Sequence, residues 1–426
     1  MVEVEIDQGR PLLGRALAPA REAMNSWLQR QLDSHAERIL GPVRRRHPIV
    51  STAKLAVVTR REDVLAVLRD TDAFTTPYRD RLPGRSILGL DGAGHRVDHA
   101  ELSAVMNASD LPMLETLVAD EARRRIRGAR HNGVFDVRAD LVQPVLELVV
   151  SRYLGLPSPG RGVQAGWAHD IFQEIFLNSG NLSTIQQRAR RSTAQMRAHV
   201  DALVAAARAA VPEAREPANV LERLVARQKA GVAVVLSDAD IRDFLIMLAV
   251  GWLWHAEKAA MLAVDEILSR PAAYARVRET AHDADIDGLR RVIWEALRFR
   301  AVQAGLLRKC VRPVTLAEGT ARARRLRAGA TVFVGTHSAM WDEDAIPEPS
   351  RFDPTRAGAQ YLIFGDGLHR CFGEHVSRVQ IPALLAPLLW SPALRRAPGR
   401  PGRLRWNGNF PSRLRVRFDA MAGATR

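Results

Sequence analysis

The residues with the clearest chemical potential lie in Phe364–His375, FGDGLHRCFGEH, which contains one of only two cysteines in the 426-residue chain. Cys371 stands among glycines, His369 precedes it by two positions, and an apolar stretch after it predicts a helix. Backbone N–H groups and the dipole at a helix start favour the thiolate form of a cysteine. A single thiolate without a second cysteine or a nearby ligand set suits neither zinc nor an iron–sulfur cluster, but it suits haem iron. The alternative is a buried structural cysteine.

The glycines and the histidine around this cysteine complete a longer pattern. Every fixed position of F-G-x-G-x-H-x-C-x-G is filled, by Phe364, Gly365, Gly367, His369, Cys371 and Gly373. This pattern resembles the haem-ligand loop of the cytochrome P450 family of haem-thiolate enzymes. The resemblance implies haem b as cofactor, Cys371 as the axial ligand of its iron, and His369 as a hydrogen-bond donor to a propionate. It places Phe364, Gly365 and Gly373 against the cofactor, where glycines let the backbone approach closely.

Two further segments support the resemblance. Glu295 and Arg298, about 75 residues before the cysteine, match the family's E-x-x-R pair, and at i, i+3 they share a helix face. In the segment PEPSRFDP, Arg351 resembles the arginine that joins this pair. The resemblance implies that these three residues are structural and hold the scaffold of the thiolate loop. By itself an E-x-x-R pair is more often a surface ion pair.

Candidate propionate ligands occur on a second predicted helix and beyond the E-x-x-R segment. The family usually has a histidine and, four residues later, an arginine on one helix, and here His95 and His99 fill these positions. Arg308 occupies a further position at which the family commonly binds a propionate. The resemblance therefore implies that His95, His99 and Arg308 bind the cofactor, since two buried propionates need cationic or hydrogen-bonding partners. A solvated histidine pair and half of a zinc site are the alternatives for the two histidines.

The segment that corresponds to the family's long central helix departs from the usual pattern. The family carries an acid and an alcohol after a glycine, and these help to deliver protons to dioxygen. Here Gly251 is followed by WLWHAE, which contains neither an acid nor a threonine at the matching positions. Trp254, His255 and Glu257 are the remaining candidates for a catalytic role, although the spacing places Glu257 on another helix face from the usual acid. Packing in the core is the alternative for His255 and the tryptophans.

This departure leaves two kinds of enzyme open. In the first, the protein is a monooxygenase with electron-transfer partners, and water or His255 relays protons. In the second, the haem reacts with peroxide or with an N–O or O–O bond of the substrate, giving rearrangement, dehydration or nitrogen transfer. His255 would then be a general acid–base with a pKa near the working pH. A haem protein without catalytic activity is a third, less favoured hypothesis.

The elements that must position these residues are mostly helical. Helical patterns dominate from about residue 97 to residue 300, with breaks near 157–162, 178–183 and 212–217. Residues 47–70 predict a short hairpin followed by a helix, residues 77–96 a loop, 314–336 strands around glycine turns, and 414–418 a closing strand. Pro382 predicts a break or kink in the helix after the cysteine. We expect one mainly α domain with a minor β portion over residues 1–426, with 1–45 as a lead-in segment.

Composition limits the partners and the location. Net charge is +15, but the arginines are scattered and no aromatic-interleaved basic stripe occurs, which argues against nucleic acid. Two cysteines cannot build a disulfide framework, and neither a signal peptide nor a long apolar run is seen. We therefore expect a cytoplasmic protein that does not bind a membrane. Its expected partners are a small organic substrate, typical of secondary metabolism, and a ferredoxin with its reductase, for which a basic face is suitable.

Overall fold

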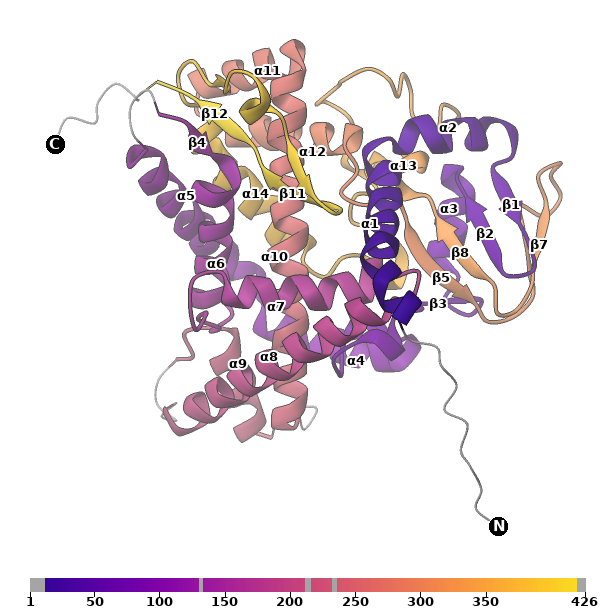
Figure 1. Cartoon of the computed structure of the whole chain (residues 1–426), viewed down its shortest axis with the longest axis horizontal. Coiled ribbons are helices and arrows are strands. Elements are labelled where there is room, and N and C mark those ends of the chain that lie inside the picture. The colour runs from indigo at the N-terminus through magenta and orange to yellow at the C-terminus, as the bar shows by residue number, and fades with distance from the viewer. Residues whose placement is uncertain (1–11, 130–132, 211–215, 232–235, 420–426) are drawn as a thin grey trace.

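The structure, a computed structural model, describes residues 12–129, 133–210, 216–231 and 236–419. Helices fill most of the molecule and a sheet lies at one side, as the sequence predicts (Figure 1). The α-helices are α1 (Leu12–Ser34), α2 (Ala36–Arg46), α3 (Arg61–Arg69), α4 (Gly92–Val105), α5 (Leu111–Arg127), α6 (Gln143–Arg152), α7 (Val163–Phe172), α8 (Ser183–Ala210), α9 (Val220–Lys229), α10 (Asp238–Ser269), α11 (Pro271–His282), α12 (Ile286–Phe299), α13 (Thr336–Ala339) and α14 (Glu374–Leu389). The lead-in is therefore helical from residue 12 onward, and residues 1–11 lie outside the described residues.

The strands form one larger sheet and smaller ones. They are β1 (Ile49–Ser51), β2 (Leu55–Val58), β3 (Phe74–Thr75), β4 (Phe135–Asp136), β5 (Leu306–Cys310), β6 (Val314–Leu316), β7 (Arg324–Leu326), β8 (Thr331–Val334), β9 (Arg395–Arg396), β10 (Arg405–Asn407), β11 (Phe410–Arg413) and β12 (Arg415–Arg417). The larger sheet has the order β1-β2-β8-β5-β3, in which β2 and β8 are parallel and the other pairs are antiparallel. The predicted hairpin and the strands within 314–336 and 414–418 are confirmed.

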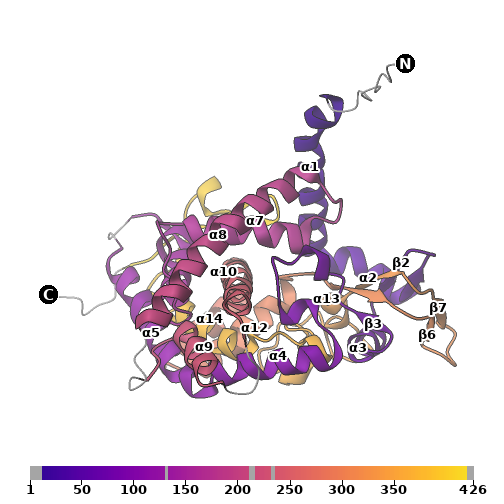
Figure 2. The ribbon, with the colours of Figure 1, turned by 90° about the horizontal axis from the view of Figure 1, so that it is seen from below.

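Helix α10 runs through the centre of the helical region, and Figure 2 shows it nearly end-on with α7, α8, α12 and α14 around it. It begins with a capping box, in which the Ser237 hydroxyl accepts from the backbone N–H of Asp240 and the Asp240 carboxylate accepts from that of Ser237. Of the helices in the described residues, α10 alone is long and apolar enough to cross a membrane, but 72% of its most apolar 18-residue window is buried inside the protein. We therefore assign α10 to the core.

Two local predictions differ from the structure. The predicted break at Pro382 is absent: helix α14 continues through Pro382 and Pro387 to Leu389, because its side chains are buried against α5, α10 and α12 and this packing offsets the lost backbone hydrogen bonds. The expected loop 77–96 ends earlier, since α4 already begins at Gly92. Before α4 this segment is irregular, as expected, apart from two 3₁₀ turns, η1 (Arg79–Arg81) and η2 (Ile87–Gly89).

Buried apolar side chains gather in two main clusters. The larger cluster surrounds α10 and includes residues of α5, α6, α12 and α14. The smaller cluster lies on the larger sheet and includes Val58, Leu68, Phe74 and Val332. The segment 364–373 lies between the sheet-side helix α3 and the start of α14, so the cysteine loop is held from both regions.

Candidate functional site

The cysteine loop has the backbone conformation that its glycines allow. Gly365 and Gly367 have φ values of +70° and +72°, which L side chains rarely adopt. A Cβ on Gly367 would lie 2.2 Å from the carbonyl oxygen of Leu68 in α3, so this glycine permits close packing of the loop on the protein itself. The backbone N–H of Cys371 donates to the carbonyl oxygen of Phe364 over 2.9 Å, which closes the loop. Backbone geometry therefore fixes the position of the cysteine.

The residue Cys371 is exposed, although the protein around its thiol raises the pKa of this group to about 11. Burial is the main cause of this shift, and the backbone N–H of Gly373 opposes it. The predicted helix start is confirmed at Glu374, but the expected net preference for the thiolate is wrong in the protein alone, since burial outweighs the N–H groups. A bound metal cation would restore the thiolate.

Three histidines gather beside this loop. His95 of α4 lies 4.8 Å from His369 and 5.6 Å from His99, measured between ring centroids. His369 Nε2 is 2.8 Å from the carboxylate of Asp91. The Nδ1 atom of His95 is buried and has no hydrogen-bond partner. Burial, together with the neighbouring histidines, lowers the pKa of His95 to about 4, so it is neutral at pH 7 and can donate a hydrogen bond without carrying charge.

Arg308 supplies a cation to the same region. Arg308 lies on β5 and is 4% exposed, and its Nη1 donates to the carbonyl oxygen of Leu307 over 2.9 Å. Burial lowers the pKa of Arg308, while Tyr78 and Asp91 partly offset this effect. Because Asp91 contacts His369 and also interacts with Arg308, the two predicted propionate ligands lie near one another.

This donor set fits the group that the loop pattern implies. An exposed cysteine, an unpartnered buried His95 nitrogen and a buried arginine fit a haem with two carboxylates. Among the described residues no group of three or more His, Cys, Asp or Glu side chains could hold a metal ion. That finding disfavours the alternative in which His95 and His99 form half of a zinc site.

The scaffold ion pair is buried, but its third member differs from the prediction. Glu295 and Arg298 are both 0% exposed and their side chains approach to 2.8 Å. Arg356, not Arg351, contacts Glu295, at 3.3 Å. The side chain of Arg351 is exposed and pairs with Glu348. Only the backbone carbonyl oxygen of Arg351 reaches the cluster, where it accepts a hydrogen bond from Arg298. The prediction for Arg351 is therefore wrong.

The sequence could not distinguish the two arginines of RFDPTR, since both lie in the same irregular segment. Their directions depend on turns that the tertiary structure sets. Sequence reasoning also missed Tyr361, whose hydroxyl donates to Glu295 Oε2 over 2.9 Å. The buried carboxylate is thus satisfied by two arginines, a tyrosine and the backbone N–H of Asp353.

Of the predicted catalytic residues in α10, two share one face. A Cβ on Gly251 would meet no atom within 4 Å, so this position borders open space. His255 follows one turn later, with Nδ1 3.2 Å from the Gly251 carbonyl oxygen and its ring packed against Phe172 and Phe176. Gly251 and His255 therefore remain the candidates to face a ligand.

The other candidates in this segment are bound elsewhere in the core. Trp254 donates from Nε1 to the carbonyl oxygen of Ala165 and packs on Phe410. Glu257 is buried and lies 2.7 Å from Arg138 Nε, and burial raises the pKa of Glu257 to about 6. Glu257 thus lies on a different helix face from Gly251, as its spacing predicts. Its carboxylate forms an ion pair with Arg138 and does not contact His255.

The second indole near Gly251 also packs in the core. Trp252 donates from Nε1 to Gln380 of α14 over 2.7 Å, and its ring lies 5.8 Å from Tyr153. The structure therefore favours core packing for Trp252 over stacking on a substrate. The indoles fill space between helices.

His255 does not have the pKa near neutrality that a general acid–base would need. Burial lowers its pKa from the ordinary 6.5 to about 4. Since a carbonyl oxygen only accepts, the contact with Gly251 places the proton on Nδ1 and leaves the lone pair on Nε2. The expectation of an acid–base histidine that titrates near pH 7 is corrected to a neutral hydrogen-bonding histidine.

Side chains far apart in the sequence surround His255. A cavity of about 10 Å³ is bordered by Phe172, Trp254, His255 and Asn409, among other residues. Beside it, Lys258 of α10 forms a buried ion pair with Asp33 of α1 at 2.7 Å. Sequence reasoning missed the partners from α1 and the β10–β11 turn. Single residues in those segments carry no motif.

The neutrality of His255 predicts a dependence of stability on pH. Because its pKa is lower in the folded than in the unfolded state, the unfolded chain takes up a proton first as the pH falls from 6.5 towards 4. The contribution of His255 to the free energy of unfolding is therefore fully present above pH 6.5. It falls as the pH drops from 6.5 to about 4, by at most about 1.4 kcal/mol per pH unit. Urea unfolding of His255→Gln should show a shallower loss over this range than the original protein. Parallel profiles would contradict a neutral, buried His255.

Comparisons with known proteins agree with this geometry. A family model described as Cytochrome P450 matches residues 268–391. Cyclomarin C epoxidase CymV of Salinispora arenicola (strain CNS-205) is 27% identical over 357 residues, which cover 81% of this chain and 85% of the relative. The 20-oxo-5-O-mycaminosyltylactone 23-monooxygenase of Streptomyces fradiae is 26% identical over 366 residues, covering 80% and 78%.

Solved structures show the same fold. The crystal structure of CalO2 superposes with a TM-score of 0.76 at 23% identity, covering 91% of this chain and 98% of that one. A mutant of P450 EryK in complex with erythromycin B has a TM-score of 0.75 at 21% identity, covering 96% and 99%. The predicted mainly helical architecture with a minor β portion is confirmed.

Proposed function

The chain belongs to the cytochrome P450 superfamily, and from this premise we propose that it is a haem-thiolate monooxygenase acting on a small organic molecule of secondary metabolism. The carrying observation is the convergence of the Cys371 thiol with His95, Arg308 and His369 at one place in the fold. An exposed cysteine and donors for two carboxylates, which lie on α4, β5 and the cysteine loop, suit haem better than other common cofactors.

Bound haem with a thiolate ligand supplies the activation of dioxygen and the transfer of one oxygen atom to a substrate. Cys371 would bind the iron, and His95, His99, Arg308 and His369 would hold the propionates. Phe364, Gly365 and Gly373 would line the cofactor edge of the loop, where a Cβ on Gly373 would lie 3.9 Å from Cys371 Sγ. The buried Glu295–Arg298–Arg356 cluster holds the segment that leads into this loop.

His255 takes a restricted part in this site. Its Nδ1 proton is directed at the Gly251 carbonyl, and its imidazole also has a hydrogen bond with the Gln303 side chain. A neutral imidazole cannot act as an acid at pH 7. Protons for the reaction would therefore reach the site through water, and His255 would orient the donor that lies against it.

The electrons would come from a ferredoxin and its reductase, since a monooxygenase needs an external donor. The net charge of +15 supports an acidic partner protein that docks electrostatically.

We also propose that residues 1–426 form one functional unit and that the protein works in the cytoplasm. The relatives' names describe enzymes that act on small molecules, which supports a substrate of that kind here.

The source of oxidising power separates the proposed function from its alternative. The names of the relatives, an epoxidase and a monooxygenase, favour the monooxygenase over peroxide-driven or oxygen-independent chemistry. We expect turnover of a substrate panel under air with a ferredoxin and reductase, and none without oxygen. Products that lack ¹⁸O after reaction under ¹⁸O₂, or equal turnover without oxygen and reductant, would overturn the monooxygenase.

A further inference from the structure

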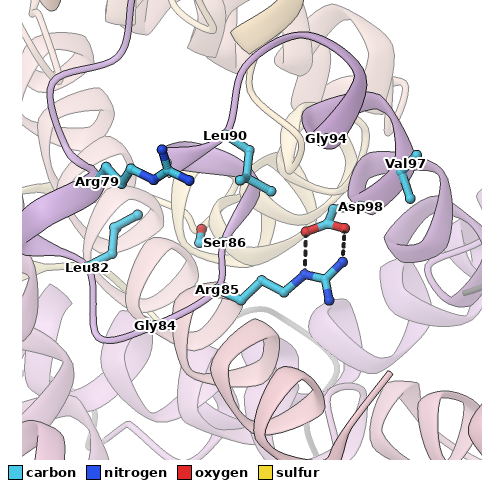
Figure 3. Close-up of a pocket in the computed structure, with 10 residues that line it drawn as sticks. Arg79, Leu82, Gly84, Arg85, Ser86, Leu90, Gly94, Val97 and Asp98 are labelled. Atoms are coloured by element: carbon cyan, nitrogen blue, oxygen red, sulfur yellow. Dashed lines mark hydrogen bonds and ion pairs between the residues drawn. The ribbon is translucent and has the colours of Figure 1, made fainter. Parts of the chain in front are cut away.

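A separate pocket of about 540 Å³ opens between the segment 79–90 and α4. Figure 3 shows Arg79 extending toward Leu90 on one side and an ion pair between Arg85 and Asp98 on the other. The pocket lies on a different face of α4 from His95 and His99, since Gly94, Val97 and Asp98 line it. It is therefore distinct from the cysteine site, although it shares a helix with it.

The two arginines of this pocket differ in their charge balance. The single charge of Arg85 faces two carboxylates, those of the buried Asp98, with contacts of 2.6 and 2.9 Å, and of Asp240 at 3.2 Å, so it is fully compensated. Arg79 is exposed, and its side chain makes no hydrogen bond or ion pair with any residue that the structure describes. One guanidinium charge thus remains uncompensated at the pocket, where a bound anion could replace water as its partner.

The other walls are apolar apart from one hydroxyl. Leu82 and Leu90 line the pocket, and Val97 is a large apolar side chain that is 43% exposed there. The nearest atom to a Cβ on Gly94 would be Leu90 Cδ2 at 4.0 Å, so the wall is open at this position. Ser86 accepts a hydrogen bond from the backbone N–H of Leu88, and its hydroxyl proton remains able to donate.

We propose that this pocket binds the carboxylate end of an amphipathic organic anion, with Arg79 and Ser86 holding the carboxylate and the leucines and Val97 covering the apolar part. A single free guanidinium matches one negative charge. A phosphate monoester would bring about two charges at pH 7, and its second charge would face Asp98 without a partner. The proposal rests on the pocket alone and stands independently of the proposed monooxygenase function.

The test is calorimetric titration of the haem-loaded protein with decanoate, 1-decanol and decyl phosphate, with the haem absorption band recorded in parallel. We expect decanoate to bind most tightly and Arg79→Gln to weaken it by at least about 10-fold, the usual effect of a lost charged hydrogen bond. Gly94→Leu should abolish binding by filling the open wall, without strain, because Gly94 has an ordinary helical backbone. Arg190→Gln, which removes an exposed arginine of α8 outside the pocket, should change nothing.

Each other outcome overturns a defined part of the proposal. Absence of decanoate binding, or equal affinity in Arg79→Gln and the original protein, would refute the pocket as a carboxylate site. Equal binding of 1-decanol would show that the charge has no role, and tighter binding of decyl phosphate would refute the preference for a monoanion. Binding that persists in Gly94→Leu and shifts the haem band would place decanoate at the haem instead.

Discussion

Replacement of Cys371 by alanine should abolish the red-shifted absorption band that the reduced, carbon-monoxide-treated haem protein gives with a thiolate ligand. Cys371 is the exposed cysteine of the glycine loop, and the other cysteine, Cys310, is buried in β5. Loss of the metal's protein ligand should lower turnover by more than the 10- to 100-fold that removal of an outer-shell partner typically costs. The measurements are the difference spectrum and turnover with reductase and ferredoxin.

Cys310 provides the matched control. It is buried in β5, 0% exposed, and its thiol donates to the carbonyl oxygen of Arg312 over 3.0 Å. Cys310→Ala removes the other sulfhydryl of the chain but should leave the band in place. A red-shifted band that persists in Cys371→Ala, or that disappears in Cys310→Ala, would refute the assignment of the ligand.

Replacement of Arg298 by methionine should destabilise the protein by about 3–5 kcal/mol, because it leaves the buried carboxylate of Glu295 without its principal partner. Arg356 and Tyr361 contact the same carboxylate, but one guanidinium at 3.3 Å and a hydroxyl do not replace a bidentate arginine. The urea midpoint of the haem-loaded protein measures this loss. Haem retention should fall with it, since α12 supports the cysteine loop through this cluster.

Two arginine variants from the same segment test the corrected assignment. Arg356→Ala should lower stability clearly, whereas Arg351→Ala should stay within about 0.5 kcal/mol, because its side chain is exposed and pairs only with exposed Glu348. Equal effects of the two substitutions would contradict the structure. A larger effect of Arg351→Ala would restore the prediction made from the sequence.

Much of the cofactor site could be predicted because its residues are close in the sequence. The six fixed residues of the cysteine loop lie within ten positions, and the conformations of Gly365 and Gly367 depend on local backbone sterics. The pairing of Glu295 with Arg298 depends on one helical turn. Such short-range rules also gave the predicted hairpin and most of the helices.

The properties of the same residues could not be predicted where distant neighbours determine them. The pKa of Cys371 is raised and that of His255 lowered, since burial by other elements outweighs the local N–H groups and the helix. The choice of Arg356 over Arg351 depends on how the segment after α13 folds back on α12. Pro382 leaves α14 intact because the helix is packed on several sides.

By itself, then, the sequence indicated the family and the mainly helical architecture and predicted the haem ligand, because these follow from motifs and periodicity within single elements. Only the tertiary structure decided that His255 is neutral, that Glu257 pairs with Arg138, and that Arg79 remains unpaired in a pocket of its own. These results depend on contacts between residues that are distant in the sequence. Arg138 and Glu257, for example, are 119 positions apart. The physical reason is that charge and hydration respond to the whole surroundings of a group, whereas backbone conformation responds mainly to its nearest neighbours.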